Sequence, residues 1–206
     1  MKQVTITYEG YTFDELDEDA KNHVRSWYAE EVLDYEWYDF TIDEMIDGLR
    51  PFGLDVNRKD VSFSGFWSQG DGASFSVSIG TNDVIKYLKE TKQAKQYWQL
   101  YINLLRDNVD LCFDIRGNDR WGYSMSLVDF DFTPYGEAFD SDSVYNKVYT
   151  AAEKLATDIL EFCQDKSSDL YRDLEAEYEY LISNEQIKES AKANEWLFKK
   201  SGKLIY

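Results

Sequence analysis

The chain has 206 residues, of which 43% are hydrophobic and 17% aromatic, so it carries enough apolar material for a folded core and is not expected to be disordered. Its 40 acidic residues outnumber 22 basic ones, and the net charge of −18 disfavours direct binding to nucleic-acid phosphate or anionic lipid. No apolar run approaches the ~20 residues of a membrane-spanning helix and no signal peptide is visible, so we expect a soluble cytoplasmic protein with no membrane partner.

The first quarter of the chain predicts one strand and two helices. Residues 2–8 alternate between polar and apolar side chains, as a short strand does. Asp17 is a candidate N-cap, and the apolar residues that follow at helical spacing predict a helix over about 17–32. The aromatic and acidic linker 33–40 can already be helical and lead into a second helix, whose capping-box pattern is Thr41–Glu44.

Residues 61–79 are the most distinctive stretch, because they contain one charged residue, Asp71, in a chain that is 30% charged. Apolar side chains alternate along 61–67 and 75–79, which predicts a β-hairpin with its tip at 66–72. The opposite face of this hairpin would carry small serine side chains. Such a face can form a flat polar binding surface, a close-packing surface for a helix, or a simple solvated surface.

The middle of the chain predicts further helix and a second hairpin. A helix starts near Thr81, and it or a successor continues to Leu105. The second hairpin has arms at 109–115 and 123–127. The alternation slips at 128–130, which predicts a β-bulge or the end of a strand.

The last third is predominantly helical. Apolar residues recur every three or four positions and predict one long helix over 140–183, with Lys166–Ser168 as the place for a kink or break. A capping box at Ser183–Gln186 predicts a final helix to about Phe198, and residues 203–206 predict a short last strand.

These elements predict an α+β fold. We expect an antiparallel sheet of about five strands, built from the two hairpins plus terminal strands, with helices on one face and one long C-terminal helix. Residues 1–206 would form a single domain, and the helix over 140–183 would extend from it or buttress it.

The tip of the first hairpin is the best candidate for a binding site. Its glycines allow a partner to approach the backbone closely, and its aromatic rings offer area for stacking. The candidate residues are Phe66, Trp67, Ser68, Gln69, Gly70, Asp71 and Gly72. The alternative is a structural turn that uses Trp67 as an anchor in the core.

Acidic residues crowd the segment from Glu9 to Asp47, where fourteen carboxylates face only Lys21 and Arg25. Acids three or four positions apart on a helix lie ~6 Å from each other, which is close to the phosphate spacing along a nucleic-acid strand, so rows of them can imitate its backbone. The candidate acidic interaction surface is Asp14, Glu15, Asp17, Glu18, Asp19, Glu30, Glu31, Asp34, Glu36, Asp39, Asp43, Glu44 and Asp47. Simple solubility is the alternative explanation.

The sequence contains no recognisable metal-binding or catalytic motif, which favours a protein without a cofactor, a metal or enzymatic activity. The one histidine, His23, fits an ordinary helix position, and Cys112 and Cys163 fit reduced thiols used as small apolar side chains. A hydrolase that acts through aspartate or glutamate stays open, because carboxylate pairs become visible only in a fold.

Three segments resemble a recurrent group of accessory proteins from tailed bacteriophages. They are the opening helix Thr12–Lys21 with the aromatic run Tyr35–Phe40, the hairpin segment Phe63–Phe75 (FSGFWSQGDGASF), and the tail Ser183–Lys203. In the look-alikes the tail usually has Asp-Gly where this chain has Ser201-Gly202. The resemblance implies a phage origin and the cytoplasm of an infected bacterium, and it supplies no catalytic residues.

Together these features favour a phage-encoded, acidic, non-enzymatic binding protein that inhibits a basic host or anti-phage-defence factor, with nucleic-acid mimicry as one mode of inhibition. The first alternative is sequestration of a nucleotide signal between Trp67, Gln69 and the serine face, although nucleotides are anions and we expect no basic cluster. The second alternative is an Asp/Glu-based hydrolase. A structural role in the virion and a homo-oligomer formed through the long helix are also open.

Overall fold

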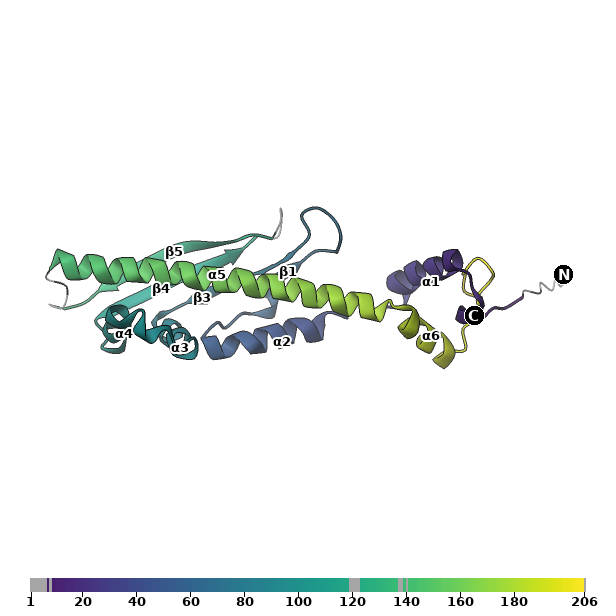
Figure 1. Ribbon diagram of the computed structural model, residues 1–206, viewed down its shortest axis with the longest axis horizontal. Coiled ribbons are helices and arrows are strands. Elements are labelled where there is room, and N and C mark those ends of the chain that lie inside the picture. The colour runs from purple at the N-terminus through teal and green to yellow at the C-terminus, as the bar shows by residue number, and fades with distance from the viewer. Residues whose placement is uncertain (1–6, 8, 119–122, 137–138, 140, 206) are drawn as a thin grey trace, which may run out of the picture. The chain divides into compact units, whose positions relative to one another are not determined.

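The computed structural model describes residues 7, 9–118, 123–136, 139 and 141–205 of a chain that forms two compact units (Figure 1). The smaller unit combines Met1–Tyr38 with Leu174–Tyr206, and the larger unit is Asp39–Asp173. The chain passes between the units after Tyr38 and again within helix α5 (Asp142–Leu181). The expectation of a single domain stays a prediction.

The smaller unit is built from helices. Its elements are the short 3-10 helix η1 (Phe13–Glu15), helix α1 (Glu18–Glu31) and helix α6 (Asn184–Ala193). Asp17 caps α1 by accepting a hydrogen bond from the backbone N–H of Ala20 at 2.9 Å, and Ser183 caps α6 by accepting one from Gln186 at 3.3 Å. Both predicted helix starts are confirmed, but α6 ends well before Phe198, where we had expected its end.

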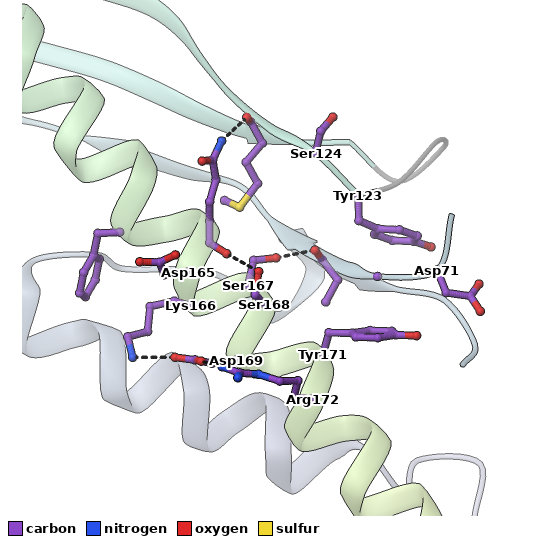
Figure 2. Close-up of a pocket in the computed structure, with 15 residues that line it drawn as sticks. Asp71, Tyr123, Ser124, Asp165, Lys166, Ser167, Ser168, Asp169, Tyr171 and Arg172 are labelled. Carbon is purple, nitrogen blue, oxygen red and sulfur yellow. Dashed lines mark hydrogen bonds and ion pairs between the residues drawn. The ribbon is translucent and has the colours of Figure 1, made fainter. Parts of the chain in front are cut away.

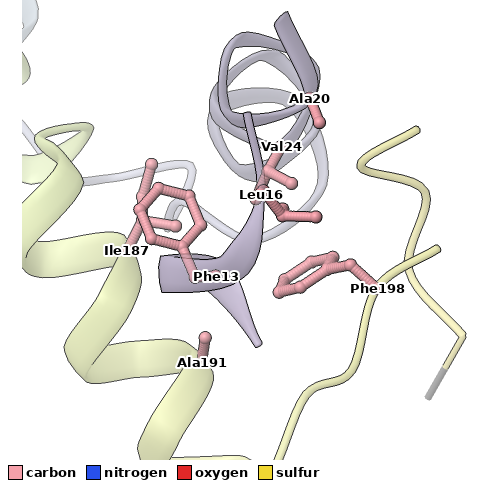
Figure 3. Packing of buried hydrophobic residues seen from close by; sticks show 7 residues of the cluster. All are labelled: Phe13, Leu16, Ala20, Val24, Ile187, Ala191 and Phe198. Atoms are coloured by element: carbon pink, nitrogen blue, oxygen red, sulfur yellow. The ribbon is translucent and has the colours of Figure 1, made fainter. Parts of the chain in front are cut away.

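A cluster of buried apolar side chains holds the smaller unit together (Figure 3). Its members are Phe13, Leu16, Ala20, Val24, Ile187, Ala191 and Phe198. Trp27 and Trp196 pack against this cluster, with ring centroids 5.2 Å apart in an edge-on arrangement. Segments from the two ends of the chain therefore share one core.

The predicted strand at 203–206 is not formed over residues 203–205, and residue 206 lies outside the described residues. Gly202 adopts a left-handed φ of +82°, and the backbone N–H of Lys199 bonds to the carbonyl oxygen of Lys203 at 2.8 Å. Beyond this tight turn the pairing is an isolated bridge between Phe198 and Leu204, beside a hydrogen bond from the backbone N–H of Ile205 to the carbonyl oxygen of Leu197 at 2.8 Å. The other predicted terminal strand, 2–8, lies outside the described residues apart from residue 7.

The larger unit contains two small antiparallel sheets. Strands β1 (Val61–Phe63) and β2 (Ala73–Phe75) form the first, and β3 (Val77–Ile79), β4 (Val109–Gly117) and β5 (Met125–Pro134) form the second in the order β3-β4-β5. Together with the helices, this arrangement confirms the α+β class. The single sheet of about five strands is not confirmed.

The predicted second arm of the first hairpin changes partner at Ser76. Phe75 pairs with Val61, the first residue of β1, whereas Val77 pairs with Ile115 of β4. Between them the backbone N–H of Ser76 donates to the carbonyl oxygen of Asp60 at 3.0 Å. Because Asp60 ends the 3-10 helix η3 (Arg58–Asp60), β1 offers no further strand residue there and the chain continues along β4.

The slip in alternation near 128–130 is a β-bulge, as predicted. Cys112 pairs with Asp131 and Asp114 pairs with Val128, so Phe113 alone lies opposite two residues of β5. Asp129, one of these two, adopts a left-handed φ of +51°. Along β4 the side chains alternate between buried and exposed or half-buried positions up to Arg116, which confirms the predicted period of two.

The remaining elements of the larger unit are helical. They are α2 (Asp39–Leu49), η2 (Arg50–Phe52), α3 (Thr81–Glu90), η4 (Gln93–Lys95), α4 (Trp98–Leu105) and the part of α5 up to Asp173. Helix α2 begins at Asp39, inside the predicted linker and before the Thr41–Glu44 pattern. Arg58 forms ion pairs with both Asp39 and Asp43, and these fix the first turn of α2.

Helix α5 is continuous over 40 residues, and its first part lies along β5 (Figure 1). The ring of Tyr149 packs edge-on against Phe130 and Phe132, with centroids 6.0 and 5.4 Å apart. The predicted break at Lys166–Ser168 is absent, because the hydroxyls of the two serines find acceptors outside or one turn back in the helix without opening its backbone. Within the described residues no helix, α5 included, combines the length and apolar content needed to cross a membrane.

Candidate functional site

The loop 64–72, which joins β1 to β2, presents aromatic side chains at the surface of the larger unit. The side chain of Trp67 is 65% exposed, and Phe66 is half-buried beside it with ring centroids 5.8 Å apart. Ser68, Gln69 and Gly70 are exposed. The core anchor that we considered as an alternative role for Trp67 is therefore wrong, whereas the role of this tip as a binding site stays a prediction.

Hydrogen bonds to Asp71 fix the conformation of this loop. Its carboxylate accepts from the hydroxyl of Ser64 at 3.1 Å and from the backbone N–H of Ser68 at 2.7 Å. The backbone N–H of Ser64 also donates to the carbonyl oxygen of Gly72 at 3.0 Å. Trp67 and Gly70 adopt left-handed φ values of +71° and +94°. Asp71, which sequence reasoning assigned to the binding surface, thus shapes the loop that carries Trp67.

Two side chains of helix α5, Tyr171 and Ser167, contact the loop and the start of β2. The hydroxyl of Tyr171 donates to the carbonyl oxygen of Gly65 at 3.3 Å, and its ring lies 5.5 Å from that of Phe66. The buried hydroxyl of Ser167 donates to the carbonyl oxygen of Ala73, the first residue of β2. Because both contacts reach a backbone oxygen at an end of the loop, the position of Trp67 is set by a helix and two strands.

A pocket of about 900 Å³ opens beside this loop, between α5 and the ends of both hairpins (Figure 2). Tyr123 and Tyr171 extend on either side of the segment that carries Asp71 and Gly72. A β-carbon on Gly72 would lie 3.0 Å from Cβ of Tyr123, so the glycine allows this close approach. The pocket therefore has aromatic walls on the side of the loop.

The charged groups of the pocket are largely paired with each other. Lys166 lies 3.0 Å from the carboxylate of Asp169, and Arg172 forms a second ion pair with the same carboxylate. The hydrogen bonds from Lys166 and Arg172 lower the pKa of Asp169. Asp165 also lines the pocket and forms no ion pair among the described residues. The lining is thus zwitterionic, with an excess of carboxylates over cations.

The serine face is divided and does not form one flat surface. Ser74 is buried and donates to the carbonyl oxygen of Asn118 at 3.3 Å. The hydroxyl of Ser76 accepts from the backbone N–H of Gly117 at 3.0 Å, and Ser78 lies opposite Asp114 in the second sheet. Ser74 and Ser76 thus bond to the backbone at the end of β4, and these bonds are not those of a close-packing surface for a helix.

The cysteines have the character of unreactive thiols. Cys112 is exposed, but partial loss of hydration, and then the charges of Asp131, Asp110 and Asp114, raise the pKa of its thiol. Burial raises the pKa of Cys163 to about 12.

The one histidine, His23, is exposed on α1. In the described part of the chain no group of histidine, cysteine, aspartate and glutamate side chains could hold a metal ion.

The thirteen acidic candidates divide between the two units, nine in the smaller and four in the larger. Several are engaged in local structure: Asp14 pairs with Lys188 at 2.7 Å, and Asp39 and Asp43 pair with Arg58. The remaining candidates are Glu15, Asp17, Glu18, Asp19, Glu30, Glu31, Asp34, Glu36, Glu44 and Asp47, all of them exposed. Among the described residues, no ion pair involves the four acids at 30–36, so the acidic charge is least compensated there.

Sequence reasoning missed the residues that α5 contributes to the site. Tyr171, Lys166 and Asp169 lie about a hundred residues after the loop, and the helical pattern marked their segment only as part of a long helix. The one sequence feature that pointed to this part of α5 was the polar segment Lys166–Ser168. It interrupts the apolar residues that recur every three or four positions, and it lies where Ser167 contacts β2.

Comparisons with known proteins identify one family. A model described as a domain of unknown function (DUF8835) matches residues 37–184, which include the loop 64–72, the pocket beside it and the whole of α5. None of the curated proteins and none of the solved structures matches the chain.

Proposed function

We propose that this chain, which belongs to the DUF8835 family of unknown function, is a non-enzymatic binding protein that inhibits a basic protein of a bacterial host or of its anti-phage defence. The observation that carries the proposal is the exposure of Trp67 on a loop whose backbone is fixed by Asp71 and Tyr171. The resemblance to phage accessory proteins supports an infected bacterial cell as the setting.

The energetics favour a protein partner for this loop. Tryptophan is enriched among the few interface residues that dominate binding, because its ring buries a large area at little entropic cost. A fixed loop loses less conformational freedom on binding than a mobile one. We therefore expect truncation of Trp67 to cost about 2 kcal/mol of binding free energy, which is roughly thirtyfold in Kd.

The charges near the loop favour a basic partner. Asp165 lines the pocket without an ion pair among the described residues, and the rings of Tyr123 and Tyr171 belong to the same lining, which suits a lysine or arginine side chain through ion pairing and cation–π contact. The exposed acids elsewhere on the chain would accelerate the encounter with such a partner. Affinity should fall as the salt concentration rises, and a flat salt response would contradict the electrostatic part of the proposal.

The deciding experiment is a pull-down from bacterial lysate with wild type and Trp67→Ala. The wild type should retain a basic protein that Trp67→Ala loses. The matched control is Phe40→Ala, which truncates another aromatic side chain of the larger unit, 76% exposed, and should retain the same protein. Equal recovery of the same partners by wild type and Trp67→Ala would remove the loop from the proposed function.

A second candidate function is the sequestration of a nucleotide signal in the pocket, which the size of the pocket favours. Against it, the two cations that an anionic ligand would need, Lys166 and Arg172, already pair with Asp169. Thermal-shift screening with cyclic and linear nucleotides separates the two functions, because only sequestration predicts a rise in Tm.

A hydrolase is less favoured, since the lowered pKa of Asp169 is opposite to the raised pKa that a general acid needs.

A further inference from the structure

One part of this acidic chain carries the opposite charge. Between Val84 and Arg106, four lysines and one arginine face a single acid, Glu90. Lys86 and Lys89 lie on α3, Lys92 and Lys95 lie in the turn and the short helix η4 before α4, and Arg106 directly follows α4, all within the larger unit. This stretch therefore carries a net positive charge, although Lys86 pairs with Asp83 just before it.

Exposed apolar side chains accompany this basic cluster. Along α4, Trp98 is 57% exposed and Leu105 is 46% exposed, and the ring of Tyr101 lies between them on the same helix face, 6.4 Å from that of Trp98. The opposite face of α4 buries Leu100 and Leu104 in the core. Helix α4 is thus apolar on two faces, and only one of them is covered.

The charges around this face are not compensated within the described residues. Lys92 and Lys95 are exposed in the turn that leads into α4, Arg106 is exposed just after it, and none of the three forms an ion pair there. We call the set Lys92, Lys95, Trp98, Tyr101, Leu105 and Arg106 the basic-aromatic patch. A surface of this kind fits an acidic partner segment that carries an aromatic anchor.

A segment of that chemistry exists on the same chain, in the smaller unit. We call Glu30, Glu31, Asp34, Tyr35 and Glu36 the acidic-aromatic segment. Tyr35 is 85% exposed, and Trp37 holds the segment in place through its ring contact with Tyr178 at 5.5 Å. Glu30 and Glu31 end α1, where a helix dipole disfavours negative charge, so their presence is not explained by helix stability.

We propose that the protein self-associates head to tail, with the acidic-aromatic segment of one copy bound to the basic-aromatic patch of a second copy. The charges of the two surfaces are complementary, each surface has an exposed aromatic anchor, and in the described residues neither surface uses its charges in ion pairs. Because the two surfaces differ, the contact is heterologous and does not stop at a dimer unless the copies close into a ring.

The net charge of −18 sets the conditions under which association should be visible. Two copies repel each other at long range, and this repulsion is screened beyond a Debye length of ~8 Å at physiological salt. Ion pairs and aromatic contacts at the interface act over shorter distances. Association should therefore be strongest at intermediate salt and weaken at high salt, where the ion pairs are screened as well.

Sedimentation equilibrium of the full chain over a wide concentration range tests the proposal. The average mass of the wild type should rise above the 24.2 kDa of one chain as concentration increases. Lys92→Glu/Lys95→Glu and Glu30→Lys/Glu31→Lys should each remain at the mass of one chain. An equimolar mixture of these two variants should associate again, because each reversed surface then finds a complementary one.

The matched control is Lys147→Glu/Lys154→Glu, which changes the net charge by the same amount at two exposed lysines of α5 and should associate as the wild type does. A wild type that keeps the mass of one chain at all concentrations would overturn the proposal, and so would association that survives either charge reversal. Trp67→Ala should associate normally, which keeps this test separate from that of the proposed function.

Discussion

The carboxylate of Asp71 accepts a hydrogen bond from the backbone N–H of Ser68 at 2.7 Å, across the loop that displays Trp67. The same carboxylate accepts from the hydroxyl of Ser64 on the other side of the loop. One side chain therefore connects the start of the loop to its tip. Because Trp67 adopts a left-handed φ that side-chain-bearing residues rarely take, these bonds offset the cost of its uncommon backbone conformation.

Asp71→Ala should loosen the loop without unfolding the protein. Losing hydrogen bonds to a charged acceptor costs about 1.5–3 kcal/mol, so the amide of Ser68 should exchange with solvent at least about tenfold faster, as measured by NMR. Ser68→Ala is the control, because it keeps the backbone N–H that donates to Asp71 and should exchange as the wild type does. Unchanged protection in Asp71→Ala would show that the loop is held by other contacts.

Ser167→Ala should destabilise the larger unit more than Ser168→Ala. The first change leaves the carbonyl oxygen of Ala73 without its donor in a buried position, which costs about 1–3 kcal/mol. Ser168 is exposed and bonds to the carbonyl oxygen of Gln164 one turn back in α5, so its loss should stay within about 0.5 kcal/mol. Urea denaturation measures both, and equal midpoints would contradict the role given to Ser167.

The sequence predicted those elements that depend on local chemistry. Asp17 and Ser183 start their helices because a cap needs only the next three residues, and the bulge at Asp129 follows from a slip in a pattern of period two. The change of partner at Ser76 could not be predicted, because the apolar alternation is the same whether Val77 pairs with β1 or with β4.

For the candidate site, the sequence predicted the exposed tip of the loop and not the contacts that reach it from α5. A charge-poor loop with glycines and tryptophan indicated an exposed tip, and Trp67 is exposed. The support from Tyr171 depends on how α5 crosses the strands, and no pattern within either segment encodes that contact. Asp71 was placed in the binding set because it lies within the predicted tip 66–72, whereas its carboxylate bonds within the loop.

Gly202→Ala should destabilise the smaller unit strongly. Gly202 has a φ of +82°, and a β-carbon there would lie 2.3 Å from the carbonyl oxygen of Ala20, a backbone atom that cannot move aside cheaply. We expect a loss of more than about 2 kcal/mol, seen as faster amide exchange at Phe198 and Val24. Gly48→Ala in α2 meets no atom within 4 Å and should stabilise the protein by about 0.5–1 kcal/mol. Wild-type exchange rates in Gly202→Ala would contradict the tight turn.

Alkaline pH should destabilise the protein through Tyr87. Burial raises the pKa of this tyrosine from 10.0 to about 12 in the folded state. A raised pKa means that the folded state holds the proton more tightly, so this stabilisation is complete below pH 10.0 and is lost as the pH rises toward 12. Each pH unit in that window should lower the free energy of unfolding by about 1.4 kcal/mol.

Tyr87→Phe keeps the ring and removes the titrating hydroxyl, so the variant should lose this part of the pH dependence between pH 10.0 and 12. Urea denaturation at a series of alkaline pH values gives the slope for both proteins. Tyr35→Phe, which removes a hydroxyl from a side chain that is 85% exposed, is the matched control and should keep the wild-type slope. Equal slopes for Tyr87→Phe and wild type would place the alkaline transition at another group, for which Tyr97 is the next candidate, because burial and its hydrogen bond to Asp158 also raise the pKa of its hydroxyl.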